Sequence, residues 1–155
     1  LDIKLDTNGT NPEAIISLST SGLIDYVAMD IKAPLDERYE AACGAEVDLD
    51  AIRKSIGFLM KGSVEVEFRT TACPAFIDED EIRLMGSAIR GAPVWALQPF
   101  SPAEALDASL RGLSPWLEEK MTELARIGGE YVATCFVRGQ EQGKGARCTA
   151  GPEHR

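Results

Sequence analysis

Short apolar stretches alternate with amphipathic ones along the chain. Five stretches have the length and composition of strands and lie at residues 1–5, 26–31, 64–71, 94–98 and 131–137. The segments between them place apolar residues at helical spacing, at 12–20, 48–61, 79–90 and 115–127, with a weaker helical turn at 36–42. Strands that alternate with helices are typical of a parallel sheet with right-handed crossovers. The pattern therefore predicts an α/β fold, either part of a barrel or a doubly wound sheet.

Capping residues mark where these helices begin. Asn11, followed by a proline, and Asp48, which precedes an apolar-periodic run, are typical N-caps. Asp78 and Glu81 have the spacing of a capping box, so the acidic run at 78–81 is interpreted as helix-start chemistry rather than as a metal site. Two Ser–Pro pairs predict further helix starts, at Ser101 and at Ser114.

The chain divides into a structured part and a tail. Residues 1–138 carry the predicted strands and helices, whereas 139–155 are rich in Gly, Gln, Lys and Arg with few apolar residues, which is typical of a disordered tail. The sequence also opens inside an apolar-alternating stretch without an initiator Met. We therefore expect a fragment whose first strand, at 1–5, is cut and leaves an exposed sheet edge.

Composition argues against several classes of function. With 16 basic and 25 acidic residues the net charge is −9, so a phosphate backbone is repelled and nucleic acid is not an expected partner. No apolar run approaches the roughly 20 residues of a membrane span, which predicts a soluble, cytoplasmic protein with no membrane partner. The cysteines at 43, 73, 135 and 148 form no C-x2-C pair and are interpreted as reduced thiols.

Polar residues gather where the predicted strands end. The four sets are Asp6-Thr7-Asn8-Gly9, Asp30 with Lys32, Arg69 to Thr71, and Gln98. The carboxyl ends of parallel strands meet at one edge of a sheet, so these side chains should converge. Asp30 and Lys32 are two residues apart and point to the same side. Two carboxylates beside two cations predict a site for a zwitterion or a polar cofactor, and a salt-bridged sheet edge is the structural alternative.

Other kinds of site fit the sequence less well. A calcium loop that begins at Asp6 would need a bidentate Glu at its twelfth position, which is Ser17. Lys32 could act as a Schiff-base lysine, as in class I aldolases, if its pKa were lowered, but Asp30 on the same side opposes that lowering. The single His, His154, lies in the tail, which argues against a His-based general base. A Schiff-base lyase and a non-catalytic α/β interaction module stay open as alternatives.

Four of these motifs together resemble a known family. They are Leu5-Asp6-Thr7-Asn8-Gly9, the stretch from Asp25 to Pro34, Phe68-Arg69-Thr70-Thr71 before Pro74, and Leu97-Gln98-Pro99-Phe100. In order and spacing they resemble the radical SAM enzymes that activate glycyl-radical enzymes. The likeness is strongest to the anaerobic ribonucleoside-triphosphate reductase activating proteins, with the pyruvate formate-lyase activating enzyme as a more distant relative. It covers residues 1–138.

The resemblance implies a partial (β/α)6 barrel of the TIM type, of which this chain would be the C-terminal portion, with strands three to six and an extension. In the family a [4Fe–4S] cluster binds S-adenosylmethionine and one electron cleaves it. The resulting 5′-deoxyadenosyl radical takes a hydrogen atom from a glycine of the partner enzyme. The implied partners are a glycyl-radical enzyme, such as anaerobic ribonucleotide reductase, and an electron donor such as flavodoxin or ferredoxin.

The resemblance also implies roles for individual residues. The S-adenosylmethionine site would be lined by Asp6, Asn8, Asp30, Lys32, Arg69 and Gln98. Asp6, Thr7 and Asp30, with the carbonyl of Ala28, would match a monovalent-cation site of the pyruvate formate-lyase activating enzymes. Ser101 stands where the relative has a His near the nucleoside, so this contact departs from the family pattern.

The cluster-binding part of the family pattern is missing. The C-x3-C-x2-C loop is absent from this sequence, and the family's Gly-Gly-Glu strand end would lie before the stretch where the sequence begins. The four cysteines present cannot replace that loop at their spacings. We therefore expect the cluster ligands before Leu1, and we expect the 155-residue chain to be inactive alone.

Overall fold

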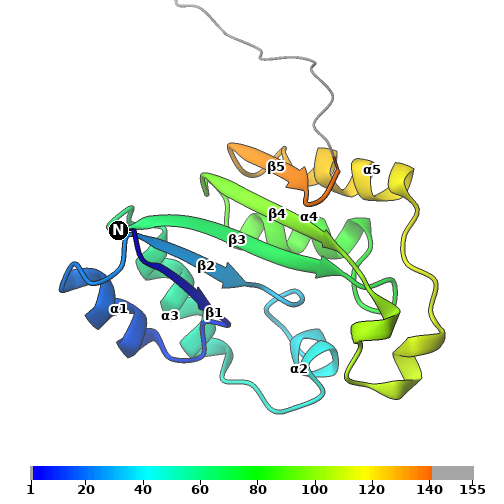
Figure 1. The fold of residues 1–155 in the computed structure, drawn as a ribbon, viewed down its shortest axis with the longest axis horizontal. Coiled ribbons are helices and arrows are strands. Elements are labelled where there is room, and N and C mark those ends of the chain that lie inside the picture. The colour runs from blue at the N-terminus through cyan, green and yellow to red at the C-terminus, as the bar shows by residue number, and fades with distance from the viewer. Residues whose placement is uncertain (1, 141–155) are drawn as a thin grey trace, which may run out of the picture.

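A computed structural model describes residues 2–140 as a five-stranded sheet with helices (Figure 1). The strands are β1 (Lys4–Thr7), β2 (Tyr26–Asp30), β3 (Glu65–Ala72), β4 (Val94–Pro99) and β5 (Thr134–Val137). The helices are α1 (Pro12–Thr20), α2 (Arg38–Cys43), α3 (Leu49–Leu59), α4 (Glu79–Ala88) and α5 (Glu118–Gly128), with short 3₁₀ turns η1 (Pro102–Glu104) and η2 (Ala108–Gly112). The strands lie side by side in chain order, and every neighbouring pair is parallel.

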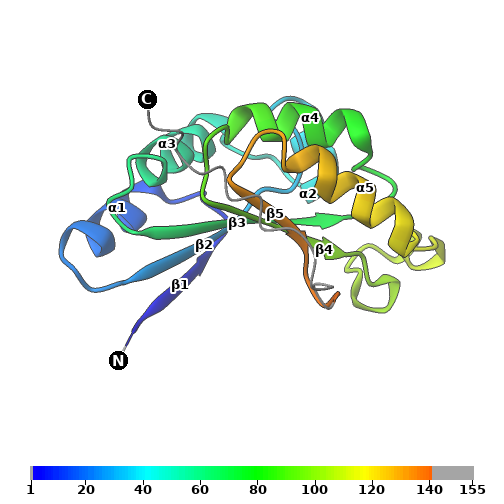
Figure 2. The ribbon, with the colours of Figure 1, turned by 90° about the horizontal axis from the view of Figure 1, so that it is seen from above.

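Helices cover one face of the sheet and leave the other open. Figure 2 shows α1, α3, α4 and α5 on one side of the strands, and no described helix lies against the opposite side. A doubly wound sheet carries helices on both faces, so this alternative does not apply to the described residues. Strand order that follows chain order is the arrangement of successive β/α units in a barrel. The predicted α/β class with parallel strands is confirmed, and the one-sided sheet is compatible with part of a TIM-like barrel.

Alternate residues of the strands face the helices and form the core. Its fully buried members include Val27, Met29, Phe68, Trp95 and Leu97. Two buried hydrogen bonds join the central strands on this side of the sheet. The Trp95 indole N–H donates to Thr70 Oγ1 at 3.0 Å, and the Thr70 hydroxyl donates to the Ile31 carbonyl at 2.9 Å. These bonds fix the backbone where β2 ends, next to the predicted site residues.

Three of the predicted helix caps are confirmed. The Asn11 side chain accepts a hydrogen bond at the start of α1, and the Asp48 side chain accepts two at the start of α3. Asp78 and Glu81 form the reciprocal bonds of a capping box at the start of α4. None of the described helices is long and apolar enough to cross a membrane.

Two predicted helix starts are wrong. Ser101 precedes only the 3₁₀ turn η1 and makes no side-chain capping bond there. α5 begins at Glu118 rather than near Ser114. Residues 113–117, directly before α5, are not helical, and within them the Trp116 indole N–H donates a 2.9 Å hydrogen bond to the Ile77 carbonyl. A tertiary contact thus overrides the local Ser–Pro signal.

Two strand boundaries also differ from the prediction. β1 spans Lys4–Thr7 rather than 1–5, because its pairing with β2 continues to Thr7, and Asp6 therefore lies within the strand rather than in the turn. β5 begins at Thr134 rather than at 131, because the backbone N–H groups of residues 131 and 132 bond to the Gly128 carbonyl at the end of α5. Leu1 and the predicted tail beyond Gln140 lie outside the described residues.

Candidate functional site

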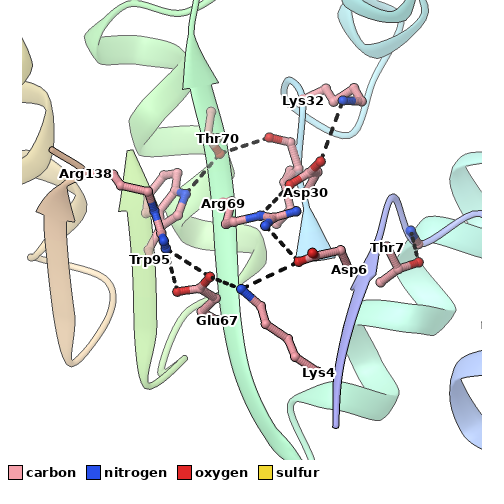
Figure 3. Close-up of polar contacts among 12 residues, drawn as sticks. Lys4, Asp6, Thr7, Asp30, Lys32, Glu67, Arg69, Thr70, Trp95 and Arg138 are labelled. Carbon is pink, nitrogen blue, oxygen red and sulfur yellow. Dashed lines mark hydrogen bonds and ion pairs between the residues drawn. The ribbon is translucent and has the colours of Figure 1, made fainter. Parts of the chain in front are cut away.

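The open face of the sheet carries a continuous series of charged side chains (Figure 3). Side chains alternate along a strand, so charged residues two apart on β1 and on β3 share this face. The series contains four cations and three carboxylates that alternate in sign across the sheet. In order they are Lys32, Asp30, Arg69, Asp6, Lys4, Glu67 and Arg138. We call this series the ion-pair chain.

Arg69 is the centre of the ion-pair chain. Its Nε donates to Asp30 Oδ1 and its Nη1 donates to Asp6 Oδ1, both at 2.8 Å. The side chain is only 16% exposed. This burial by itself lowers the pKa of the guanidinium, but the hydrogen bond to Asp30 and the charges of Asp30 and Asp6 outweigh it and raise the pKa. Arg69 therefore stays charged and joins carboxylates from two strands, as the convergence of the strand ends predicted.

Lys32 extends the ion-pair chain just beyond the end of β2. Its Nζ lies 4.0 Å from Asp30 Oδ2, and its side chain is about half-exposed. The backbone N–H of Lys32 donates to the hydroxyl of the buried Tyr39 at 3.4 Å. Burial raises the pKa of Tyr39 to about 12, so this hydroxyl stays protonated near neutral pH. Lys32 thus pairs with a carboxylate at a strand exit, a placement that suits the binding of an anion.

Three predicted site residues lie outside the ion-pair chain. Thr7 Oγ1 accepts from the Gly9 N–H at 3.1 Å, and Asn8 Oδ1 accepts from the N–H and the hydroxyl of Thr10 at 3.1 and 2.8 Å. Both side chains therefore shape the turn after β1. Gln98, on β4, lines a cavity whose wall shares Thr71 and Phe100 with the cavity that contains Asp30, Lys32 and Arg69 in its lining. The roles of these residues in binding a ligand or a cation stay predictions.

Three members of the ion-pair chain, namely Lys4, Glu67 and Arg138, were not identified from the sequence. Arg138 Nη2 contacts the two carboxylate oxygens of Glu67 at 2.8 and 2.9 Å. Lys4 Nζ lies 3.5 Å from Glu67 Oε1 and 3.6 Å from Asp6 Oδ1. A signal for Glu67 was present, since it stands two residues before Arg69 on one strand and therefore shares its face.

A cavity opens beside the ion-pair chain. It has a volume of about 160 Å³, and its lining includes the charged Asp30, Lys32 and Arg69 together with the aromatic Phe76 and Phe100. A second cavity of about 510 Å³ adjoins it, since Lys32 and Phe76 line both, and it extends between α2 and η2. Charged and apolar walls together fit a small amphiphilic ligand.

The described residues do not fit a metal cluster. They contain no group of three His, Cys, Asp or Glu side chains placed to bind a metal ion. Burial raises the pKa of the Cys135 thiol to about 12, and burial also raises the pKa of Cys43 despite the opposing charge of Lys32. Both therefore stay protonated near neutral pH, whereas iron–sulfur clusters are bound by thiolates. Cys148 lies outside the described residues.

The fold and the site define a parallel α/β protein with a cluster of charged side chains beside a cavity at the carboxyl ends of its strands. No protein-family model matches the chain. The chain is 36% identical over 140 residues to the Methanocaldococcus jannaschii protein named "Putative glycyl-radical enzyme activating enzyme MJ1227". The match covers 88% of this chain and 58% of that protein, so the chain spans little more than half of its relative's length. The predicted resemblance is confirmed: over most of its length the chain is related to a glycyl-radical enzyme activating protein.

Proposed function

We propose that the chain is the C-terminal part of a radical S-adenosylmethionine enzyme that generates a glycyl radical on a partner enzyme. The similarity to an activating protein over 140 residues supports this class of reaction. The observation that carries the proposal is the placement of Asp6, Asp30, Lys32 and Arg69 together, beside a cavity at the ends of β1 to β3. These four residues lie in the motifs on which the resemblance rests.

The charged residues suit the amino-acid end of S-adenosylmethionine. Its carboxylate would bind to Lys32 and Arg69, and its ammonium group would bind to Asp30. The aromatic side chains of Phe76 and Phe100 in the cavity wall would pack against the less polar adenosyl end. Further polar contacts in the proposed site come from the two amides, Asn8 and Gln98, and from the carboxylate of Asp6.

Asp6, Thr7 and Asp30 are the proposed monovalent-cation site. The carboxylates of Asp6 and Asp30 both contact Arg69, so a bound cation would share them with the guanidinium. Two neighbouring positive charges repel unless a further anion is present. The ligand carboxylate would supply that anion, and we therefore expect the cation and S-adenosylmethionine to bind together.

The cluster and the partners of the proposed enzyme involve parts of the protein outside this chain. Because the described thiols do not fit an iron–sulfur cluster, we place the [4Fe–4S] ligands in the portion of the relative's length that this chain does not cover. The proposed protein substrate is a glycyl-radical enzyme, first of all anaerobic ribonucleotide reductase. The proposed electron donor is a flavodoxin or ferredoxin.

Anaerobic reconstitution of the full-length protein with iron and sulfide tests this proposal. With dithionite as reductant, we expect methionine and 5′-deoxyadenosine to form from S-adenosylmethionine. Arg69→Met should lower kcat/KM at least about tenfold, because the ligand carboxylate loses a charged hydrogen-bond donor. Arg126→Met is the matched control, since Arg126 is an exposed arginine of α5 that pairs with Glu123 and Glu130, and it should leave kcat/KM unchanged.

The proposed reaction class and the proposed partner enzyme are tested by different outcomes. A reconstituted protein that does not cleave S-adenosylmethionine would refute the proposed class. Cleavage without a glycyl-radical signal on anaerobic ribonucleotide reductase, in electron paramagnetic resonance, would refute only the partner. Borohydride trapping of a carbonyl substrate on Lys32 would instead favour the Schiff-base lyase.

A further inference from the structure

Glu67 is the only formally charged residue among the buried residues that the structure describes. It is 5% exposed. A buried carboxylate is costly to remove from water and is retained where cations and hydrogen bonds compensate. Glu67 lies on β3, the middle strand of the sheet, and its side chain lies on the open face. The proposed ligand site does not use it.

The partners of Glu67 come from the two edge strands. Lys4 belongs to β1 and places its Nζ 3.5 Å from Oε1, and Arg138 directly follows β5 and contacts both oxygens at 2.8 and 2.9 Å. Lys4 also lies over the Tyr26 ring at 5.7 Å, and Arg138 lies over the Phe136 ring at 5.9 Å. One carboxylate in the middle strand therefore draws both edges toward the open face, in the direction in which a barrel curves.

Lys4 connects Glu67 to the ligand site. Its Nζ lies 3.6 Å from Asp6 Oδ1, the same oxygen that accepts from Arg69 Nη1 at 2.8 Å. Two cations thus compete for one carboxylate oxygen. Glu67 gives Lys4 a second carboxylate at similar distance, so Asp6 keeps its hydrogen bond with Arg69. Without the charge of Glu67, Lys4 would attract Asp6 more strongly and weaken its hold on Arg69.

We propose that Glu67 is a positioning residue that acts through Lys4 and Arg138. By holding both edge strands it sets the curvature of the open face, and by neutralising Lys4 it keeps Asp6 on Arg69. The effect on curvature follows from the contacts alone. The effect on ligand binding rests on the proposed function, because it takes S-adenosylmethionine as the ligand.

Glu67→Gln in the full-length protein tests both effects, since it preserves the side-chain shape and removes the charge. Amide hydrogen exchange in β1 and β5 should accelerate at least about tenfold, because both edges lose their anchor. KM for S-adenosylmethionine should rise about tenfold with a smaller change in kcat, because binding rather than chemistry is disturbed. Glu65→Gln is the matched control on the same strand and face, and its exposed side chain should make it neutral in both measurements.

A double variant distinguishes positioning from simple packing. In Lys4→Met/Glu67→Gln the competing cation is gone, so Asp6 can return to Arg69 and KM should fall at least about threefold relative to Glu67→Gln. If Glu67 only fills space, the second substitution adds to the loss. The proposal is overturned by unchanged exchange at both edges in Glu67→Gln, or by a KM in the double variant that equals or exceeds that of the single variant.

A second variant and a measurement without ligand complete the test. If Glu67→Gln does not fold, Arg138→Gln tests the link at one edge: β5 amides should exchange faster while β1 amides do not change, and equal behaviour of the two edges overturns the role in curvature. The exchange measurement needs no S-adenosylmethionine. It therefore tests the role in curvature even if the full-length protein proves to have another function.

Discussion

Gly9 is the residue on which the exit of the chain from β1 depends. Its φ is +78°, a backbone conformation that side chains with a Cβ rarely adopt, and a Cβ here would overlap the methyl group of Met29 in the core. Its carbonyl accepts a 2.7 Å hydrogen bond from the hydroxyl of Ser55, which is buried in α3. The turn after Asp6 is thereby pressed against the core, which fixes the direction in which the chain leaves the site.

Gly9→Ala is therefore expected to destabilise the intact protein by roughly 2–4 kcal/mol, through left-handed backbone strain plus overpacking against Met29. Gly22→Ala is the matched control. Gly22 has a φ of +66° but open space around it, so Gly22→Ala should destabilise the protein only through backbone strain, by about 1–2 kcal/mol. Urea unfolding measures both losses, and equal values would show that the contact with Met29 is unimportant.

The predictability of individual site residues depends on how local their placement is. Asp30, Lys32 and Arg69 were predicted because position along a parallel strand already determines the sheet edge at which a side chain lies. Arg138 directly follows the last predicted strand, so its sheet edge could be predicted in the same way, but its partner could not. Its contact with Glu67 spans 71 residues of sequence and depends on the curvature of the sheet, which no local pattern encodes.

At the scale of elements, Lys120 joins the starts of α4 and α5. Its Nζ lies 2.6 Å from Asp78 Oδ1 and 2.8 Å from Glu79 Oε1, and it lies 5.4 Å from the centre of the Trp116 ring. The ammonium thus bonds the carboxylate that caps α4. The hydrogen bonds from Lys120 lower the pKa of both carboxyl groups.

This link predicts a pH-dependent contribution to stability. Because both carboxyl pKa values are lowered in the folded protein, the contribution is complete above the ordinary values of 3.8 and 4.5 and is lost as the pH falls through the lowered values. Lys120→Met should lower Tm by a few degrees at pH 7 and make little difference at about pH 2, where the carboxyl groups are protonated. Thermal unfolding across this range measures the effect.

Arg83→Met is the appropriate comparison for Lys120→Met. Arg83 pairs with Glu79 and Asp80 inside α4 and joins no second helix. Its removal should change Tm less at pH 7, because ion pairs within one exposed helix contribute little. If both substitutions lower Tm by the same amount, the link between α4 and α5 contributes no more to stability than an ion pair within one helix.

Element boundaries were predictable where the signal is local. The caps at Asn11, Asp48 and Asp78 bond to N–H groups within three residues, so their effect can be read from sequence alone. The start of α5 is set by Trp116, whose indole bonds to the Ile77 carbonyl 39 residues away. A distant partner of this kind is invisible to a pattern of Ser and Pro.

At the scale of the whole molecule, the alternation of strands and helices predicted parallel pairing, but the uncovered face of the sheet required the structure. The ion-pair chain carries a net charge of +1, from its four cations and three carboxylates, within a sequence of net charge −9. A locally positive surface on an acidic protein attracts anionic groups selectively. This balance agrees with the proposed binding of a carboxylate there.

The proposed placement of the cluster ligands outside this chain leads to a prediction about metal removal. The core of the described residues is built from their own apolar side chains, including Phe68, Ile82 and Trp95, and no described group of side chains is arranged to bind a metal. A domain whose stability does not depend on metal binding keeps its protection when the metal is removed. Chelation of iron from the reconstituted full-length protein should therefore abolish cleavage of S-adenosylmethionine while amide exchange in β3, β4 and α4 changes less than about twofold.

Hydrogen-exchange mass spectrometry of the iron-loaded and iron-free protein measures this change. The control is protein treated in parallel with the iron-loaded chelator. Loss of protection in β3 and β4 on chelation would place the cluster within the folding unit of this chain and contradict the assignment of its ligands elsewhere.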